Sequence, residues 1–436
     1  MLSEILNGFL LFSIIIITAY LVRHCIFTFT VLKSERLQKP KRPISKISGY
    51  NPSVSILIPA HNEEHVIGAL LGKMSELNYP VEKLEILAID DASTDKTGAI
   101  ADNYAKRYSQ IRVLHRNREI GGCGKPAALN HAIKQAFGEI IIVFDADYIP
   151  HPDVVRRLVE VFADPIVGAV QGRPVVLNEP ENIVTRLNAF ERIGGYKVDQ
   201  QARDLLQLIP QFGGTVGGFR KSIIQKLGGF DETILTEDTD LTFSIALAGY
   251  RIRYSDHVEC YEEAVASWRT YWRQRQRWAK GHMQVCLKYW QRVLRSKHLT
   301  FRQKLDGILL LNVYFMPLVT LVSVAIGAYL IITGSIFSIV LWLVLPTSAY
   351  SFVGNYAPFF EIGVGAYLDG RRQIQWLAPL LIFSYILNTL ICGKAFLSLI
   401  VDKVLCRGSV WVKTEHLGNA DSYMHNQTET NAVAEY

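Results

Sequence analysis

Apolar residues are distributed unevenly along the chain: long apolar runs lie near both ends, and a mixed pattern lies between them. Residues 5–22 carry no charge, and after Arg23 the apolar character continues to Leu32. Further apolar runs cover about residues 308–332, 336–366 and 375–401. About 20 apolar residues are needed to cross a bilayer core as a helix, so the first run predicts a membrane-spanning helix. The later runs predict helices that cross the membrane or lie in its interface.

Between Val54 and about Asp256, short β-branched runs alternate with amphipathic segments. The runs lie at 54–59, 84–90, 111–115, 139–147 and 168–173, and the amphipathic segments lie near 63–77, 95–108, 125–137 and 153–162. Strands that alternate with helices predict an α/β fold with a mostly parallel sheet. Ligands of such sheets bind at the carboxyl ends of the strands, so the residues there are the first candidates for a site.

Acidic residues follow three of the predicted strands. Glu63 comes after the first, Asp90 and Asp91 end the second, and Asp145 and Asp147 end the fourth. Gathering carboxylates costs electrostatic energy, so we expect a cation among them. The two acids of the Asp-x-Asp pair suit a divalent metal, and hard oxygen ligands select Mg²⁺ or Mn²⁺. Such a metal would neutralise the diphosphate of a nucleotide sugar.

Two further motifs have a structural explanation as well as a functional one. The glycine-rich segment 121–126 precedes a predicted helix, and its Lys125 could contact an anion or simply lie exposed in a turn. Thr236, Glu237 and Asp238 open another helical segment, where a cap and acidic residues are common for reasons of the helix dipole alone. The residues alone leave both alternatives open.

The net charge of +6 is informative mainly through its placement. From Ala264 to Leu305 there are eleven Lys or Arg residues and no Asp or Glu, in a stretch also rich in Trp and Tyr. Because an apolar run follows directly, a membrane surface is a better partner for this basic helix than nucleic acid. The six cysteines show no metal-binding spacing, so we expect neither a disulfide framework nor a structural zinc site.

The charges that flank the first apolar run predict its orientation. Lys33, Arg36 and several basic residues up to Lys46 follow it, whereas only Glu4 precedes it. The positive-inside rule therefore places the chain from residue 33 onward in the cytoplasm. Strict alternation of crossings would put the C-terminus outside, but Lys403 and the basic residues after it favour the inside, and the sequence leaves this conflict open.

The motifs IPAHNEE, DDAS, GKPAALN, FDAD, TED and QRQRW occur in this order between about residues 52 and 290. Together they resemble glycosyltransferase family 2 in its membrane-integrated branch, which includes synthases of cellulose and poly-N-acetylglucosamine and some glycolipid synthases. The segment 411–414 also resembles a C-terminal signature of such enzymes. The resemblance implies a GT-A catalytic domain and metal-dependent transfer of a hexose with inversion. A catalytically dead scaffold would be expected to lack some of these acids, but all of them are present.

The resemblance also implies a role for each matching residue. Asp238 would be the catalytic base, Trp278 would stack on the acceptor sugar, and Thr236 and Glu237 would lie beside the acceptor. Asp145 and Asp147 would hold the metal. The nucleotide-sugar contacts would come from Pro59, Glu63, Asp90, Asp91, Lys125, Asp145, Gln274 and Arg277. A departure is the apolar segment 212–215, where cellulose synthases have a more polar acceptor loop.

These observations predict a division of the chain and a set of partners. The segments are a membrane helix (1–32), a basic linker (33–51), the catalytic domain (52–262), basic interface helices (263–305), membrane or interfacial helices (306–402) and a tail (403–436). We expect a UDP-sugar donor, a glycan or lipid-linked acceptor, membrane lipids, and export or accessory subunits, with no nucleic acid. The protein would be integral to the plasma (inner) membrane with its catalytic domain in the cytoplasm. A processive polysaccharide synthase is the first hypothesis and a single-addition glycolipid synthase the second.

Overall fold

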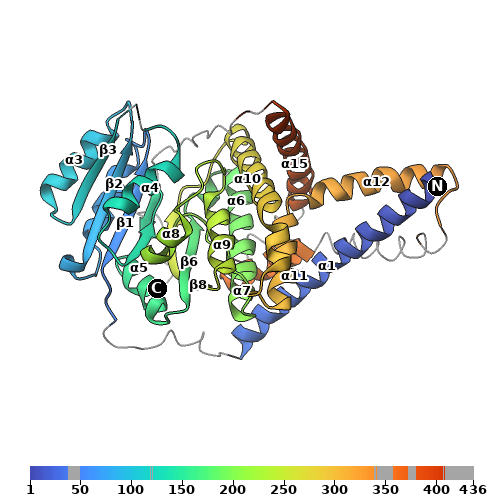
Figure 1. Ribbon diagram of the computed structural model, residues 1–436, viewed down its shortest axis with the longest axis horizontal. Coiled ribbons are helices and arrows are strands. Elements are labelled where there is room, and N and C mark those ends of the chain that lie inside the picture. Colours follow the sequence, from blue (N-terminus) through green and yellow to red (C-terminus); the bar gives the residue numbers. More distant parts are fainter. Residues whose placement is uncertain are drawn as a thin grey trace.

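The computed structural model describes residues 1–37, 50–117, 119, 121–337, 340, 357–371, 380–405 and 407. The predictions for the basic linker beyond residue 37, for most of the run 336–366 and for the tail motif at 411–414 lie outside these residues. The described residues form an α/β domain built on one sheet, with a group of long helices on one side of it (Figure 1).

In the described part of the chain, eight strands form one sheet in the order β3-β2-β1-β4-β7-β6-β8-β5. The parallel half of the sheet contains β1 to β4, and β7 is antiparallel to both of its neighbours. The strands are β1 (Val54–Ala60), β2 (Leu84–Asp91), β3 (Ile111–Arg116), β4 (Ile140–Val143), β5 (Tyr148–Pro150), β6 (Val167–Val176), β7 (Gly217–Arg220) and β8 (Arg251–Glu262). The α/β prediction is confirmed, and β5, β7 and β8 are strands that the hydrophobic pattern does not predict.

Helices cover both faces of the sheet because successive side chains of a strand point to opposite faces. Ile56 and Ile58 pack with the helices α2 (Ile67–Ser75) and α5 (Val154–Val159). Leu57, between them, packs on the other face. That second face is covered by α4 (Lys125–Gln135), α8 (Lys221–Leu227), α9 (Glu237–Leu247) and part of α10 (Trp268–Arg295). The remaining helix beside β2 and β3 is α3 (Thr97–Arg107).

A helical rod between β6 and β7 connects the sheet to the long helices. It begins at α6 (Ile183–Arg192), where Asn182 and Thr185 form a capping box, passes through the π-helical segment η4 (Ile193–Gln200) and ends with α7 (Gln201–Leu205). A Cβ at Gly194 would lie 2.6 Å from the side chain of Ile362, so glycine permits the close packing of η4 on α14 (Ala357–Leu368). π-Helical segments are rare and often lie at functional sites.

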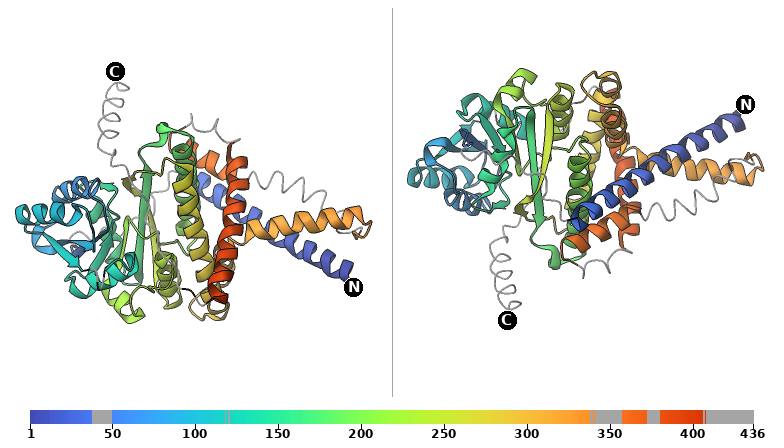
Figure 2. Two further views of the ribbon diagram at one scale, coloured as in Figure 1. Left: turned by 90° about the horizontal axis from the view of Figure 1, so that it is seen from above. Right: turned by 90° about the horizontal axis from the view of Figure 1, so that it is seen from below.

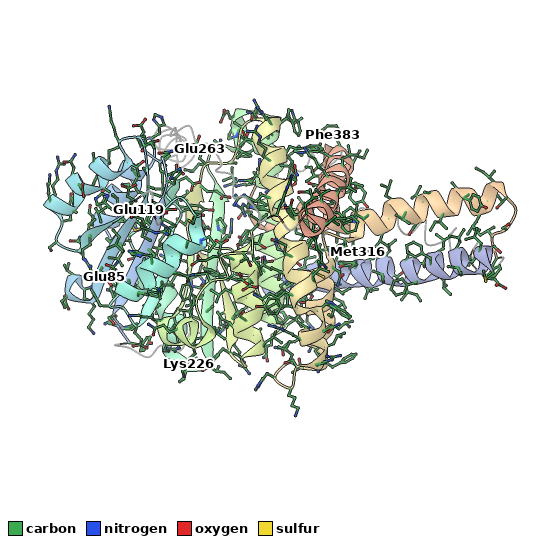
Figure 3. The ribbon with its side chains drawn as sticks, turned by 45° about the horizontal axis from the view of Figure 1, so that its top comes forward. Glu85, Glu119, Lys226, Glu263, Met316 and Phe383 are labelled. Atoms are coloured by element: carbon green, nitrogen blue, oxygen red, sulfur yellow. The ribbon has the colours of Figure 1, made fainter. Side chains whose placement is uncertain are left out.

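Among the described residues, two helices are long and apolar enough to cross a membrane: α1 (Leu2–Arg36) and the described part of α15 (Leu380–Val404). A third candidate is the pair α11 (Phe301–Asn312) and α12 (Met316–Ile332), which is bent by 73°. α12 and the N-terminal half of α1 project side by side from the rest of the molecule, while α15 lies across them and packs along α10 (Figures 1 and 2). Figure 3 labels Met316 at the bend, beside α15 and far from Glu85 of β2.

Candidate active site

A cavity of about 810 Å³ lies between the catalytic domain and the long helices. Its lining combines the carboxyl-end residues of β1, β2 and β4 with the starts of α4 and α9, the QRQRW part of α10, and side chains of α1, α11, α14 and α15. The predicted site residues that line it are Pro59, Glu63, Asp91, Lys125, Asp145, Asp147, Thr236, Glu237, Asp238, Gln274, Arg277 and Trp278. The predicted site residues that share this cavity thus come from Pro59 to Trp278 in the sequence.

Asp90 is the predicted site residue that lies outside the lining formed by the described residues. Its carboxylate accepts from the Ser93 amide at 3.1 Å and lies 2.9 Å from Nδ1 of His115. The hydrogen bond to Asp90 is the main reason that the pKa of His115 is raised. Asp91 instead faces the cavity, where its carboxylate accepts from Nη1 of Arg116 at 2.5 Å and from the Gly122 amide at 3.0 Å. Of the two candidates, Asp91 is therefore the one placed to reach a ligand.

Lys125 occupies the centre of the acidic group. Its ammonium donates to Oδ1 of Asp145 at 2.5 Å and to the Gly214 carbonyl at 2.9 Å, and it lies 3.9 Å from Oε1 of Glu237. The glycine-rich segment before α4 thus delivers a lysine to the carboxylates and not to solvent, because its side chain is only 16% exposed. This cation provides part of the charge compensation that the clustered acids require.

Of the acids at the start of α9, Glu237 is buried and Asp238 is half-buried, and burial raises the pKa of each. The pKa of Glu237 rises to about 7, with Lys125 opposing the rise. Burial also raises the pKa of Asp238, whose Oδ1 accepts from the Thr239 amide at 2.6 Å. A carboxylate with a raised pKa in a cavity is suited to accept a proton during a reaction.

The structure also shows how closely α9 approaches α10. A Cβ at Gly281 would lie 2.6 to 2.8 Å from atoms of Thr236, so this glycine lets α10 pack directly on the first turn of α9. Thr236 is the residue before that turn, but its hydroxyl makes no cap and has no hydrogen-bond partner among the described residues. The predicted capping position is therefore confirmed, whereas a side-chain capping bond is not present.

The donor set around Asp145 and Asp147 suits a Mg²⁺ or Mn²⁺ ion. No group of three or more His, Cys, Asp or Glu side chains converges in the part of the chain that the structure describes. Two carboxylates alone are a usual protein contribution for Mg²⁺, which keeps several waters and takes further oxygens from a substrate diphosphate. The ammonium of Lys125 on Asp145 shows that this position already stabilises a positive charge.

Around Trp278, the structure shows contacts that the motif alone does not predict. The guanidinium carbon of Arg275 lies 4.3 Å from the Trp278 ring centroid, and that of Arg192 lies 5.5 Å away. Arg192, Glu191 and Tyr196 also line the cavity and come from the rod α6–η4. In the sequence they are marked only by the adjacent charges of Glu191 and Arg192, which follow a segment of intermixed apolar and polar residues.

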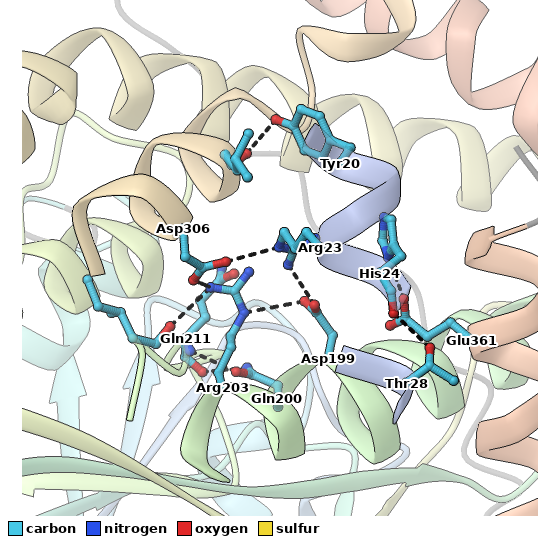
Figure 4. Close-up of polar contacts among 12 residues, drawn as sticks. Tyr20, Arg23, His24, Thr28, Asp199, Gln200, Arg203, Gln211, Asp306 and Glu361 are labelled. Carbon is cyan, nitrogen blue, oxygen red and sulfur yellow. Dashed lines mark hydrogen bonds and ion pairs between the residues drawn. The ribbon is translucent and has the colours of Figure 1, made fainter. Parts of the chain in front are cut away.

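The far end of the cavity carries a second group of polar residues that sequence reasoning missed (Figure 4). Arg23 of α1 donates to Asp306 at 3.0 Å and to Asp199 at 2.6 Å, and Arg203 donates to Asp306 at 2.6 Å. His24, one residue further along α1, contacts Glu361 of α14. The charge that interrupts the first apolar run is therefore paired with the rod and with α11, and it attaches α1 to the catalytic domain.

Sequence comparison gives a family match and relatives that include a glycolipid synthase and a polysaccharide synthase. Residues 52–281 match the family described as "Glycosyltransferase like family 2". A probable glycosyltransferase, YdaM, of Bacillus subtilis is 38% identical over 56% of this chain and 59% of its own length. A beta-monoglucosyldiacylglycerol synthase of Nostoc is 36% identical over 64% and 59%. A poly-beta-1,6-N-acetyl-D-glucosamine synthase of Staphylococcus epidermidis is 27% identical over 87% and 89%.

Structural comparison supports the GT-A fold. A mannosyltransferase from Pyrobaculum calidifontis, solved with GDP-Man and Mn²⁺, superposes with a TM-score of 0.58 and 23% identity over 88% of this chain and 98% of its own. The chain spans about three fifths of the length of the first two curated relatives, 59% in each case. Because the matched region covers more than half of the chain and contains the acids, the lysine and the QRQRW motif of the cavity, this protein belongs to glycosyltransferase family 2.

Proposed function

We propose that the protein transfers a sugar from a UDP-sugar to a growing β-linked polysaccharide at the membrane, with inversion. The observation that carries the proposal is the composition of the cavity, which runs from the acids of the catalytic domain to polar groups of the long helices. His24, Tyr314, Glu361 and Asn388 are among the polar groups in the lining that belong to the long helices and the α11–α12 bend. A glycan carries hydroxyl groups that can form hydrogen bonds with such side chains, whereas acyl chains cannot.

In this proposal the residues of the cavity divide the work between donor and acceptor. Gln274 and Arg277 contact the diphosphate. The guanidinium of Arg277 matches the geometry of phosphate oxygens. Asp145 and Asp147 hold Mg²⁺ or Mn²⁺, which neutralises charge on the leaving diphosphate when bound. Asp238 takes the proton of the acceptor hydroxyl as that oxygen attacks the anomeric carbon in line with the departing diphosphate.

The proposed orientation follows from the position of α1. Lys33 and Arg36 lie at its C-terminal end, on the side of the catalytic domain, so the positive-inside rule places that domain in the cytoplasm. UDP-sugars are made in the same compartment. α15 lies across α12 and along α10 (Figures 1 and 2), which supports an interfacial position for it and leaves Lys403 on the cytoplasmic side.

The second candidate function is a glycolipid synthase that adds one sugar to a lipid. It is favoured by a specific observation: the Nostoc relative of that activity is 36% identical, compared with 27% for the polysaccharide synthase of Staphylococcus epidermidis. A lipid acceptor would enter between the same long helices. The two candidates share the donor, the base and the metal, and differ in what fills the far end of the cavity.

An assay of products on membranes that carry the protein tests the proposal. Radiolabelled UDP-glucose, UDP-N-acetylglucosamine and UDP-galactose are supplied in turn with Mg²⁺ or Mn²⁺, and membranes with Asp238→Asn serve as the control. We expect label in a high-molecular-weight fraction that resists lipid extraction. Label that moves into organic solvent as a small species would overturn the polysaccharide proposal and establish the glycolipid candidate.

The raised pKa values predict how the rate depends on pH. Burial raises the pKa of Glu237 to about 7 and also raises that of Asp238. A base works only when deprotonated, and a raised pKa means that the base is protonated at a higher pH, so on acidification the rate should begin to fall above the usual carboxyl value of about 4. The measurement is the initial transfer rate from pH 5 to 9, with UDP binding followed in parallel. A rate that stays constant down to pH 5 would contradict this assignment.

A further inference from the structure

Arg192, the last residue of α6, is held by an ion pair of defined geometry. Its Nε and Nη2 donate to the two carboxylate oxygens of Glu262 at 2.6 and 2.9 Å. Glu262 is buried, and it also accepts from the hydroxyl of Tyr148. Bidentate pairing of a guanidinium with a carboxylate fixes orientation as well as distance, because two parallel hydrogen bonds restrict rotation.

The other side of Arg192 faces the aromatic residues of the cavity. Its guanidinium carbon lies 5.5 Å from the Trp278 ring centroid and 5.7 Å from that of Tyr196. A second guanidinium, from Arg275, lies 4.3 Å from the Trp278 ring. A cation over an indole ring is attracted by its π-electrons, more strongly where water is excluded. Two guanidinium groups therefore set the position of Trp278.

Arg275 is itself fixed by the same rod. Its Nη2 donates to Oδ1 of Asn188 at 2.8 Å and to the carboxylate of Glu191, which directly precedes Arg192. The hydroxyl of Tyr271 donates to the same carboxylate at 2.6 Å. The last turn of α6 thus supplies both Glu191, which holds the guanidinium of Arg275, and Arg192, the second guanidinium beside Trp278.

The chain of contacts leads back to the proposed metal site. Tyr148 directly follows Asp147 in sequence and begins β5, where it is the register partner of Glu262 on β8. The path from Asp147 through Tyr148, Glu262 and Arg192 to Trp278 uses one peptide bond, a strand pair, a bidentate ion pair and a ring contact. It joins the acids assigned to the donor with the ring assigned to the acceptor without passing through a loop.

We propose that Tyr148, Glu262 and Arg192 form a positioning chain that sets the Trp278 ring relative to the Asp145–Asp147 segment, so that the acceptor sugar is placed against the bound donor. The inference rests on the proposed function, in which Trp278 stacks on the acceptor. None of the three residues touches the reacting atoms; they act through Trp278. A purely structural ion pair would stabilise the fold but would not distinguish sugar transfer from hydrolysis of the donor by water.

The test compares these two reactions in the full-length protein in membranes. Arg192→Lys keeps the charge but loses the planar fork, and Tyr148→Phe removes a single hydroxyl. For each we expect polymer formation to fall about tenfold while release of free sugar from the UDP-sugar and binding of UDP stay within about twofold, because misplacing an acceptor platform costs transfer specifically. The double variant should be no worse than the poorer single variant, since both changes act through Glu262.

A matched control is available on the same strand. Arg253 of β8 makes a bidentate pair with Asp204 at 2.7 and 3.2 Å, and neither residue lines the cavity. Arg253→Lys should leave the ratio of transfer to hydrolysis unchanged. An equal loss in that control, or a parallel loss of UDP binding and hydrolysis in Arg192→Lys, would overturn the inference and assign the pair to folding. Normal product length in Trp278→Ala would instead show that the stacking role in the proposed function is wrong.

Discussion

Replacing Asp238 by Asn is expected to lower sugar transfer by about 10³-fold, because general-base catalysis contributes on the order of 10² to 10⁴ and the amide cannot accept the proton. The carboxylate is half-buried at the start of α9, and removal from water raises its pKa. Asp238 lines the cavity, where its carboxylate can accept the proton of an acceptor hydroxyl. The measurement is incorporation of labelled sugar under saturating donor.

A measurement of UDP binding distinguishes a loss of catalysis from a loss of the nucleotide-binding site. The Asn variant keeps the shape of the side chain and removes a charge that would repel the diphosphate, so we expect UDP affinity to stay within about threefold. Asp240→Asn is the control. Asp240 lies on the same helix and is buried, but it does not line the cavity, and its Oδ1 lies 2.6 Å from Nζ of Lys288. Loss of UDP binding in the Asp238 variant would contradict its role as base.

The parallel half of the sheet and the acids at its edge could be predicted because each depends on local periodicity and on strand order alone. The distinction between Asp90 and Asp91 could not. Adjacent residues of a strand point to opposite faces, and the register pairs Asp90 with His115 and Asp91 with Arg116 on β3. Which of the two faces the cavity depends on that register, which the sequence of β2 does not contain.

The residues around Trp278 were missed for a similar reason. Arg192 and Glu262 are 70 residues apart, and they meet because the rod α6–η4 packs beside the end of β8. The π-helical segment η4, unlike α6, has no strong hydrophobic period. Charged residues in such a segment are usually solvated, so only the tertiary structure reveals that they are partners.

The apolar runs predicted the long helices but not their shape. The run 308–332 is divided into α11 and α12 with a bend of 73°, and Pro317 lies in the first turn of α12. Proline cannot donate a backbone hydrogen bond and is tolerated at that position, whereas it would disrupt the interior of one continuous helix. Likewise, Arg23 interrupts the first run because it pairs with Asp199 and Asp306 of the domain beside it (Figure 4).

Replacing Asp145 by Asn is expected to weaken binding of UDP in the presence of Mn²⁺ by about 100-fold and transfer by about 10³-fold, since a metal ligand and a positioned charge are lost together. Asp145 makes two hydrogen bonds in the structure: its backbone amide donates to the Thr215 hydroxyl at 3.1 Å, and its Oδ1 accepts from Lys125 at 2.5 Å. The Asn side chain cannot balance the lysine or hold the metal. Asp164→Asn, an exposed acid outside the cavity, should have no effect.

Metal binding by Asp145 and its pairing with Lys125 can be separated by a second variant, because Lys125→Met removes the ammonium and leaves both carboxylates. If Asp145 binds metal, the signal of protein-bound Mn²⁺ in the presence of UDP should persist in Lys125→Met and disappear in Asp145→Asn. If Asp145 serves only to hold the lysine, the two variants should lose UDP affinity equally and their Mn²⁺ signals should match. In Asp145→Asn, Glu237 and Asp238 remain near Lys125 and would compensate its charge. Retained Mn²⁺ binding in Asp145→Asn would therefore refute the metal assignment while leaving the role of Asp238 intact.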